Sequence, residues 1–290
     1  MSAASMRAVV LTPGPDYHEA WDWAFDVEAR ALEATGFTVE PQAWTKADPA
    51  GADVILPLVA WGYDQGIAEW LALLDRAEAE HWPMINPPAL LRWNSDKRYL
   101  AQLADAGVAT VPTMTVACLD EAAMDEARHR FGSDQLVVKP PVSASAVGTY
   151  RIGADDPIPA DVAGRAMIVQ PFQRAIAEAG EYSLMLFGGA LGHAIVKRPQ
   201  AGDFRVQPHL GGRDFSADPP PGALALARAA LAAAPAAATY ARVDMIDGND
   251  GRLAIMELEL IEPALFLHQS SASATLFGAA VASAVRALRA

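Results

Sequence analysis

The chain has 290 residues, of which 52% are hydrophobic, and its formal net charge is −13 at pH 7. This length predicts two or three small domains, and the acidic balance argues against a general binder of nucleic acid or of anionic membranes. Cys118 is the only cysteine, so internal disulfides and a cysteine metal cluster are excluded. Neither a signal peptide nor a run of about 18 uncharged apolar residues is apparent, and we therefore expect a cytoplasmic protein.

Strands and helices alternate in the first part of the chain. Apolar runs predict strands at 6–13, 37–44 and 52–60, and helical spacing predicts helices at 18–36 and 66–80. Such alternation is typical of an α/β sheet layer. We therefore predict an α/β domain over residues 1–92.

Residues 93–172 predict a small α+β lobe. A helix is expected over 95–107, with Asn94 or Ser95 as its N-cap and Gly107 just past its end. A further helix is expected near 120–131, among short strands at 110–117, 134–141, 149–153 and 166–172. We expect this lobe to act as a lid.

Residues 173–290 predict an antiparallel lobe. Two apolar runs meet at Gly188-Gly189, which indicates a hairpin over 181–199. An extended segment over 203–212, an alanine-rich helix over 223–238 and a second hairpin follow. An amphipathic helix over about 271–289 ends the chain.

Three glutamates interrupt the apolar run of the second hairpin, in the segment IMELELIEP at 255–263. Asp250-Gly251 suits a two-residue type I′ turn, because both central positions of that turn need positive φ. Counting back from this turn predicts three facing pairs: Met245 with Met256, Asp244 with Glu257, and Arg242 with Glu259. Directly opposed side chains have Cβ atoms about 4.5–5.5 Å apart, and like charges there are destabilising.

This register raises the question of what neutralises the acids. Arg242 can partner Glu259, but Asp244 and Glu257 still lack a counter-charge. A bound divalent cation would supply it, since Mg²⁺ typically takes one or two carboxylates together with substrate phosphates. The alternative is a hairpin whose acidic face is solvated. Glu262 falls on the opposite face by strict alternation, and its role stays open.

Two lysines and one polar row are candidates for binding anions. Lys139 ends an apolar strand beside the loop VSASAVG, whose N–H groups and hydroxyls suit a phosphate. Lys97 lies in the first turn of a predicted helix, which is an unusual place for a cation because the helix dipole there favours anions. A strand would align Arg205, Gln207 and His209 on one face, and that row could clamp phosphate or carboxylate. Each of these side chains could instead simply be exposed.

A nucleotide could bind at the end of the run IVQPF. Backbone groups beside Gln170 and the proline that follows it could bind an adenine edge. Glu178, six residues past Phe172, could accept a hydrogen bond from a ribose hydroxyl.

The order of these features resembles the ATP-grasp superfamily, and within it the glutathione-synthetase-like carboxylate–amine ligases, over residues 86–270. The resemblance implies ATP between two lobes, with its phosphates on Lys97 and Lys139. It also implies a cation, Mg²⁺ or Mn²⁺, on Asp244, Glu257 and Glu259. Adenine would lie at the hinge and the ribose on Glu178, the hinge being Gln170, Pro171 and Phe172.

Two features depart from the superfamily pattern. The metal strand usually reads Glu-x-Asn, whereas Glu257-Leu-Glu259 carries a second carboxylate, which adds negative charge. The phosphate loop has serine and alanine where several glycines are usual, so Ser143 and Ser145 would replace some backbone contacts. RWNSDKRYLAQL, KPPVSASAVGTYRI, GEYSLMLF and MELELIEPALFL are similar to the cyclo-ligase of D-cycloserine biosynthesis, which activates its substrate with ATP and closes a five-membered ring.

The resemblance implies a three-lobed ligase that forms an amide-type bond while ATP goes to ADP and phosphate. A substrate carboxylate would become an acylphosphate, and a nitrogen would then displace phosphate. Lys197 would neutralise phosphate and Arg205 would stabilise the transferring group, with Arg242 and His209 near a small amino-acid-like substrate. A kinase of the same fold, or a Mg-ATP-binding module without catalysis, is the alternative. No nucleic-acid or membrane partner is expected, and a homodimer is a habit of the superfamily.

Overall fold

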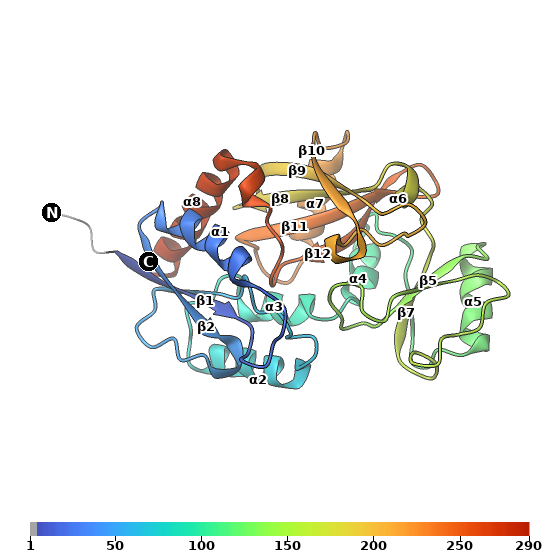
Figure 1. Cartoon of the computed structure of the whole chain (residues 1–290), viewed down its shortest axis with the longest axis horizontal. Helices are drawn as coiled ribbons and strands as arrows, with labels where there is room; N and C mark the ends of the chain where they lie inside the picture. Colours follow the sequence, from blue (N-terminus) through green and yellow to red (C-terminus); the bar gives the residue numbers. More distant parts are fainter. Residues whose placement is uncertain (1–4, 290) are drawn as a thin grey trace.

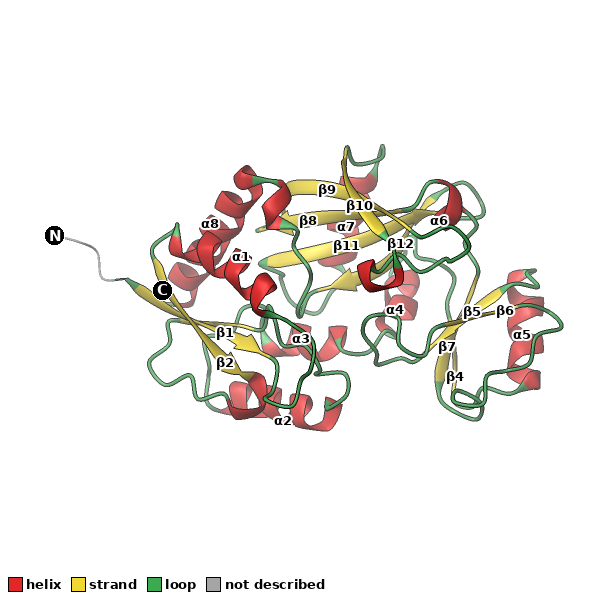
Figure 2. Cartoon of the chain, in the orientation of Figure 1, coloured by secondary structure: helices red, strands yellow, loops and turns green. Residues whose placement is uncertain are grey.

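The computed structural model describes residues 5–289, which form three sheets surrounded by helices (Figure 1). Residues between 6 and 56 form the first sheet, residues between 114 and 171 the second, and residues between 181 and 259 the third. The first and second sheets lie at opposite ends of the molecule, with the third between them (Figure 2).

The first sheet is parallel and is covered on both faces. It contains β1 (Met6–Thr12), β2 (Phe37–Ala43) and β3 (Val54–Leu56) in the order β2-β1-β3. Ala8 and Val10 pack toward α1 (Asp22–Glu33) and α8 (Ser271–Leu288), whereas Val9 and Leu11 pack toward η1 (Trp44–Lys46) and α2 (Ile67–Ala79). Burial on both faces explains the nearly continuous apolar run of β1. The expected α/β layer is confirmed.

Helix α8 returns from the end of the chain to cover the first sheet. Its 18 residues are long and apolar enough to cross a membrane by length and composition alone. Phe277, Val281 and Val285, however, are fully buried beside α1 and the third sheet. The packed face is that of the predicted amphipathic helix, and core helices of globular proteins commonly share this composition.

The second sheet is small and has one helix against it. Its strands β4 (Met114–Val116), β5 (Leu136–Lys139), β6 (Tyr150–Ile152) and β7 (Met167–Pro171) lie in the order β4-β7-β5-β6. Helix α5 (Glu121–Phe131) begins where the Asp120 carboxylate accepts a hydrogen bond from the Ala123 N–H at 2.9 Å, and it ends at Gly132. These elements match the predicted α+β lobe.

The third sheet is antiparallel. Its strands, in spatial order, are β10 (Arg213–Ala217), β9 (Ala190–Arg198), β8 (Glu181–Phe187), β11 (Tyr240–Asp247) and β12 (Leu253–Glu259). One face packs on α4 (Tyr99–Asp105) and α7 (Ala223–Ala232). The other face changes along β8 from Glu181 and Ser183 to Met185 and Phe187, and the apolar half joins the core beneath α8. The polar half of this face, which carries Glu181 and Ser183, is the candidate position of the functional site.

Two local predictions were wrong. The helix expected over 95–107 is shorter than predicted: it is α4, which begins at Tyr99 after the separate helix α3 (Pro88–Asn94), and neither Asn94 nor Ser95 caps a helix N-terminus. The segment 203–212 is a loop with the turn η2 (Pro208–Leu210), so the expected row of Arg205, Gln207 and His209 is not formed. Two short helices, α6 (Ala175–Glu178) and η3 (Leu267–Gln269), were not predicted from the sequence.

The hairpin of β11 and β12 reaches the predicted pairing by an unexpected route. Gly248, not Asn249, faces Arg252 across the turn, because Gly248 N–H donates to Arg252 O at 2.8 Å. The loop is therefore one residue longer than expected, and Met245 pairs with Ile255. A bulge at Met256 then shifts the register back, so that Asp244 faces Glu257 and Arg242 faces Glu259, as predicted.

Side chains from α3 and α4 cover the free edge of β12. Asn94 Nδ2 donates to Leu258 O at 2.9 Å, and Leu260 N–H donates to Asn94 Oδ1 at 2.9 Å. The Tyr99 hydroxyl accepts from Leu258 N–H at 2.7 Å and donates to Leu258 O at 3.1 Å. These contacts replace a neighbouring strand, and they hold the backbone between Glu257 and Glu259 in place.

We predict that Asn94→Ala destabilises the protein by about 1–3 kcal/mol, because the buried Leu260 N–H loses its acceptor while Leu258 O keeps the Tyr99 hydroxyl as a donor. Urea denaturation followed by circular dichroism measures this loss. Asp105→Ala, at an exposed position at the end of α4, is the control and should change stability little. Equal midpoints and slopes for the two variants would contradict the role given to Asn94.

Candidate active site

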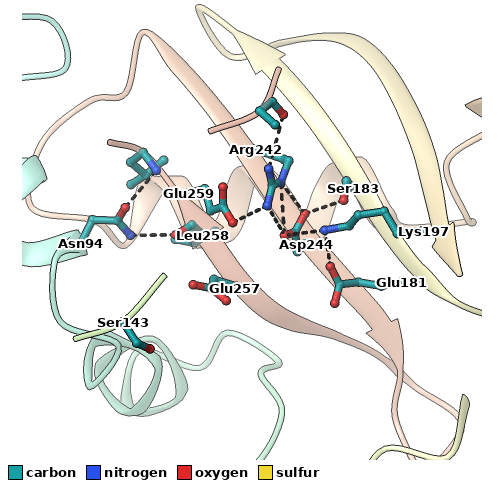
Figure 3. A network of polar contacts seen from close by, with 12 residues as sticks. Asn94, Ser143, Glu181, Ser183, Lys197, Arg242, Asp244, Glu257, Leu258 and Glu259 are labelled. Atoms are coloured by element: carbon teal, nitrogen blue, oxygen red, sulfur yellow. Dashed lines mark hydrogen bonds and ion pairs between the residues drawn. The ribbon is translucent and has the colours of Figure 1, made fainter. Parts of the chain in front are cut away.

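Asp244 is the centre of the polar half of the third sheet (Figure 3). Its carboxylate accepts hydrogen bonds from the Ser183 hydroxyl at 2.5 Å and from Lys197 Nζ at 3.0 Å. The Arg242 guanidinium, two residues earlier on β11, binds both of its oxygens at 3.0–3.2 Å. Asp244 is only 3% exposed, so these partners are what make its burial tolerable.

Two further ion pairs extend this network toward β12 and α4. Arg242 also pairs with Glu259, and Lys97 Nζ lies 3.1 Å from Glu257 Oε1. The expectation that Asp244 and Glu257 lack counter-charges was therefore wrong. Lysines that are distant in the sequence supply those charges: Lys197 reaches Asp244 from β9 across β8, and Lys97 reaches Glu257 from the α3–α4 turn beside β12.

Glu181 belongs to the network and was missed by the sequence analysis. It begins β8, is 7% exposed, and its Oε1 lies 2.5 Å from Lys197 Nζ. Counting back from Gly188-Gly189 without interruption pairs Glu181 with Val196 instead. A bulge near Gly192 shifts the register and places Glu181 opposite Lys197. A side chain at Gly192 would meet the Phe187 ring at 2.6 Å, so glycine is needed there.

The network perturbs its carboxyl groups in different directions. Burial disfavours ionised Asp244, but Arg242 and Lys197 outweigh it and hold the pKa of that carboxyl well below its usual range. Burial likewise opposes the ionised form of Glu257, yet Lys97 and Lys139 leave its pKa lowered. Burial raises the pKa of Glu259 to about 7, because Arg242 only partly offsets burial and the nearby Asp244. Glu259 is thus the acid of this group that changes charge near neutral pH.

Lys139 and the small-residue loop lie on the side of the second sheet. Lys139 is 8% exposed, and no described side chain forms an ion pair with it. Burial lowers its pKa, although Glu257 opposes this shift. The Lys97 ammonium donates to Ser143 O, and Lys97 N–H donates to Pro141 O at 2.8 Å. Both predicted lysines therefore lie at this loop.

The predicted loop serines differ in their surroundings. Ser143 is buried, whereas Ser145 is exposed and has a φ of 53°, followed by Ala146 with a φ of 59°. Left-handed backbone in non-glycine residues is uncommon and strained. The loop therefore keeps the backbone shape of a glycine-rich turn although its residues are serine and alanine.

The predicted hinge connects the second and third sheets. Gln170 and Pro171 end β7, and Phe172 N–H donates to Gln135 O at 2.9 Å. Asn249 Nδ2 donates to Phe172 O at 2.8 Å, so the backbone groups of Phe172 already have protein partners. Arg151 lies over the Phe172 ring, 4.0 Å from its centroid.

Among the described residues, three further predicted ones also form no hydrogen bond or ion pair with the network around Asp244. Glu178 is exposed at the end of α6. Arg205 forms an ion pair with Asp203 at 2.9 Å in its own loop, and its charge acts on Tyr150 of the second sheet. His209 is exposed in η2. These assignments stay predictions.

Two of the three carboxylates predicted to bind a divalent cation are placed to do so. Among residues 5–289 no group of three His, Cys, Asp or Glu side chains forms a ready cation site. Both oxygens of Asp244 already have partners, whereas the side chains of Glu257 and Glu259 are 26% and 29% exposed. Two carboxylates completed by phosphate oxygens are a typical Mg²⁺ arrangement. The site therefore fits a cation on Glu257 and Glu259, and Asp244 would join only by giving up an ion pair.

Comparisons with known proteins show which sequences this chain resembles. Residues 8–86 match the family model described as D-cycloserine synthetase DcsG, N-terminal domain. The chain is 32% identical over 273 residues to the cycloserine biosynthesis protein DcsG of Streptomyces lavendulae, which covers 87% of this chain and 90% of that protein. A glutathione synthetase of Prochlorococcus marinus (strain MIT 9313) is 29% identical over 199 residues, 66% of this chain and 57% of that protein.

Solved structures agree along the whole chain. The crystal structure of D-cycloserine synthetase DcsG matches with a TM-score of 0.80 and 28% identity, covering 97% of this chain and 100% of that one. The ATP-grasp ligase PsnB, complexed with its minimal precursor, matches with a TM-score of 0.65 and 16% identity, covering 99% and 100%.

Fold and site together define an ATP-grasp carboxylate–amine ligase, an enzyme that uses ATP to form an amide-type carbon–nitrogen bond. The predicted fold and enzyme class are thereby confirmed. Within this class the chain belongs to the DcsG family.

We predict that Asp244→Ala lowers the free energy of unfolding by about 3–5 kcal/mol, since removing one partner of a buried ion pair leaves other charges uncompensated. Asp250→Ala is the matched control, because Asp250 pairs with Arg252 in solvent and such pairs contribute about 0–1 kcal/mol. Chemical denaturation measures both. Losses of equal size would show that Asp244 does not organise the third sheet.

Proposed function

We propose that the enzyme activates the carboxylate of a small amino-acid-type substrate and closes a ring by forming a C–N bond within that molecule. The observation that carries this proposal is the polar face of the third sheet, where buried lysines, an arginine and carboxylates are held in fixed ion pairs. Preorganised charges of this kind stabilise a transferring phosphoryl group. Similarity to a cycloserine biosynthesis protein over 87% of the chain supports D-cycloserine-type ring closure.

In this proposal ATP lies between the second and third sheets. Lys97 and Lys139 bind its phosphates together with Ser143 and Ser145 of the loop. The hinge binds adenine, and a carboxylate near the start of β8, Glu178 or the buried Glu181, accepts from the ribose. The small lobe, residues 109–170, closes over ATP and keeps water away from the activated substrate.

The proposed reaction has two steps, phosphorylation of the carboxylate and ring closure. A carboxylate oxygen of the substrate attacks the γ-phosphorus and ADP leaves, which gives an acylphosphate. A nitrogen of the same molecule then attacks the acyl carbon, the C–O bond to phosphate breaks, phosphate leaves with the electron pair, and the nitrogen loses a proton.

The chain's own residues hold and neutralise the reacting groups. Arg242, beside the third-sheet carboxylates, stabilises the negative charge that develops on the carbonyl oxygen when the nitrogen attacks the acyl carbon. Lys197 and Arg205 remain the proposed catalytic residues, and His209 a proposed substrate contact. A divalent cation, Mg²⁺ or Mn²⁺, on Glu257 and Glu259 with Asp244 would neutralise phosphate charge. We further propose a cytoplasmic homodimer whose partners are ATP and the small substrate, without nucleic-acid or membrane partners.

The reaction is tested by measuring ADP release with Mg-ATP against O-ureidoserine and a panel of small amino acids, followed by the mass of the product. A ligase that closes a ring gives ADP and a cyclic product lighter than the substrate by one water, or, from O-ureidoserine, a still lighter ring when hydrolysis also removes the carbamoyl group from the ring nitrogen. A phosphorylated product would support the kinase alternative instead, and ATP binding without ADP release would support the non-catalytic module.

We predict that Glu257→Gln lowers kcat/KM for ADP release by about 100-fold or more, because it removes a cation ligand and the partner of Lys97. Asp250→Asn, in the exposed turn of the same hairpin, is the control and should keep its activity. A folded Glu257→Gln enzyme with full ATP-dependent turnover would disprove the proposed site.

Cation binding should release protons, because the pKa of Glu259 is about 7 in the free enzyme. At about pH 6 Glu259 is protonated and must ionise to bind the cation, so about one proton is expected to leave, and almost none at about pH 8.5. Titration calorimetry with Mg-ATP in buffers of different ionisation enthalpy measures this number. Glu259→Gln should abolish the difference between the two pH values, and a release independent of pH would rule out Glu259 as a ligand.

A further inference from the structure

Glu28 is a buried acid that the ion-pair network does not use. It lies on α1, is 4% exposed, and its Oε2 has no hydrogen-bond partner among the described residues. Burying an unpaired carboxylate is costly, so such a group is usually neutral or paired with a bound cation. A fold that needed only helix packing here would be served by an apolar side chain.

Glu28 lines a small cavity together with Glu262, whose role the sequence left open. The cavity has a volume of about 60 Å³ and lies between α1 and the segment that follows β12. Burial and the nearby Glu262 raise the pKa of Glu28 well above its ordinary range. Two acids therefore share a space that holds no basic side chain except His268 among its lining residues.

Aromatic rings form much of the remaining wall. Trp23, Trp61 and Phe266 line the cavity, and the Trp23 and Trp61 ring centroids are 5.7 Å apart. Two acceptor carboxylates beside aromatic faces suit a compact cation, because an ammonium has three donors and is also attracted by ring faces. A phosphate or carboxylate would be repelled by the same two acids.

The cavity adjoins the end of the active site where Arg242 lies. Ala264 is part of its wall, and Arg242 Nη1 donates to Ala264 O at 3.4 Å. Glu262 lies within electrostatic range of Arg242 and also of Glu28. A ligand whose carboxylate lies near Arg242 can therefore extend an amino group toward this pair of acids, which it meets first at Glu262.

We infer that this cavity binds the ammonium group of the amino-acid substrate, with Glu28 and Glu262 as its acceptors, an assignment that rests on the proposed function. With this assignment, the N-terminal α/β layer selects an amino acid over the same carboxylic acid without its amino group. Glu28 is then a substrate-binding residue contributed by α1.

The test is the binding of O-ureidoserine, and of its analogue without the amino group, measured by calorimetry in the absence of ATP. Wild type should bind the amino compound about 10–100-fold more tightly, since a hydrogen bond to a charged group contributes about 1.5–3 kcal/mol. Glu28→Gln should bring the two affinities within about threefold, while Glu33→Gln, at an exposed position on the same helix, should keep the wild-type ratio. An unchanged ratio in Glu28→Gln would overturn the assignment.

Two further measurements separate the possible failures. Glu262→Gln must also reduce the ratio, and this variant decides the matter if Glu28→Gln does not fold. Ring closure is followed independently by product mass. If the ring closes but the ratio of the two affinities does not depend on Glu28, this site alone is overturned. If the ratio depends on Glu28 but no ring closes, the proposed reaction alone is overturned. If neither compound binds, both proposals are overturned.

Discussion

The ion pairs around Asp244 are the interaction on which the site depends. A carboxylate that is 3% exposed is held by an arginine of its own strand, a lysine of β9 and a serine of β8, so four groups on three strands must keep their register together. Because removing one partner leaves the others buried and uncompensated, the network ties site geometry to the stability of the third sheet. The charges proposed to meet ATP are therefore fixed in the free enzyme and need not reorganise during the reaction.

Two bulges make this network possible. One near Gly192 brings Lys197 opposite Glu181, and one at Met256 returns Glu257 to Asp244 after a turn that is one residue too long. Without either bulge a charged side chain would lie on the opposite face, toward the apolar layer of α4 and α7. Asn94 and Tyr99 then fix the outer edge of β12, which connects the α3–α4 turn carrying Lys97 to the strand carrying Glu257.

The second glutamate of β12 gives this enzyme a property that an asparagine would not. Glu259 accepts from Arg242 but is crowded by Asp244 and Glu257, and burial raises its pKa to about 7. Glu259 can therefore carry a proton in the free site, and the proposed cation would displace it. Glu28 and Glu262 form a second acidic pair, and Glu262 lies within electrostatic range of both Arg242 and Glu259. The place proposed for the substrate's amino group is therefore close to the place proposed for phosphoryl transfer.

Periodicity in the sequence predicted the three sheets and most of their helices, because these depend on neighbours along the chain. The predicted facing of Asp244 with Glu257 is reached only because a bulge at Met256 offsets a turn that is one residue longer than expected. The order of motifs, through the resemblance it carries, assigned Lys97 and Lys139 to the same phosphates, and the structure brings both lysines to one loop. Reasoning from the sequence missed Glu181 and Glu28, and it left Asp244 and Glu257 without counter-charges, because bulges shift the register and because their partners lie on distant elements. Local signals specify which way a side chain points on its own strand, and only tertiary packing decides which charge it meets there.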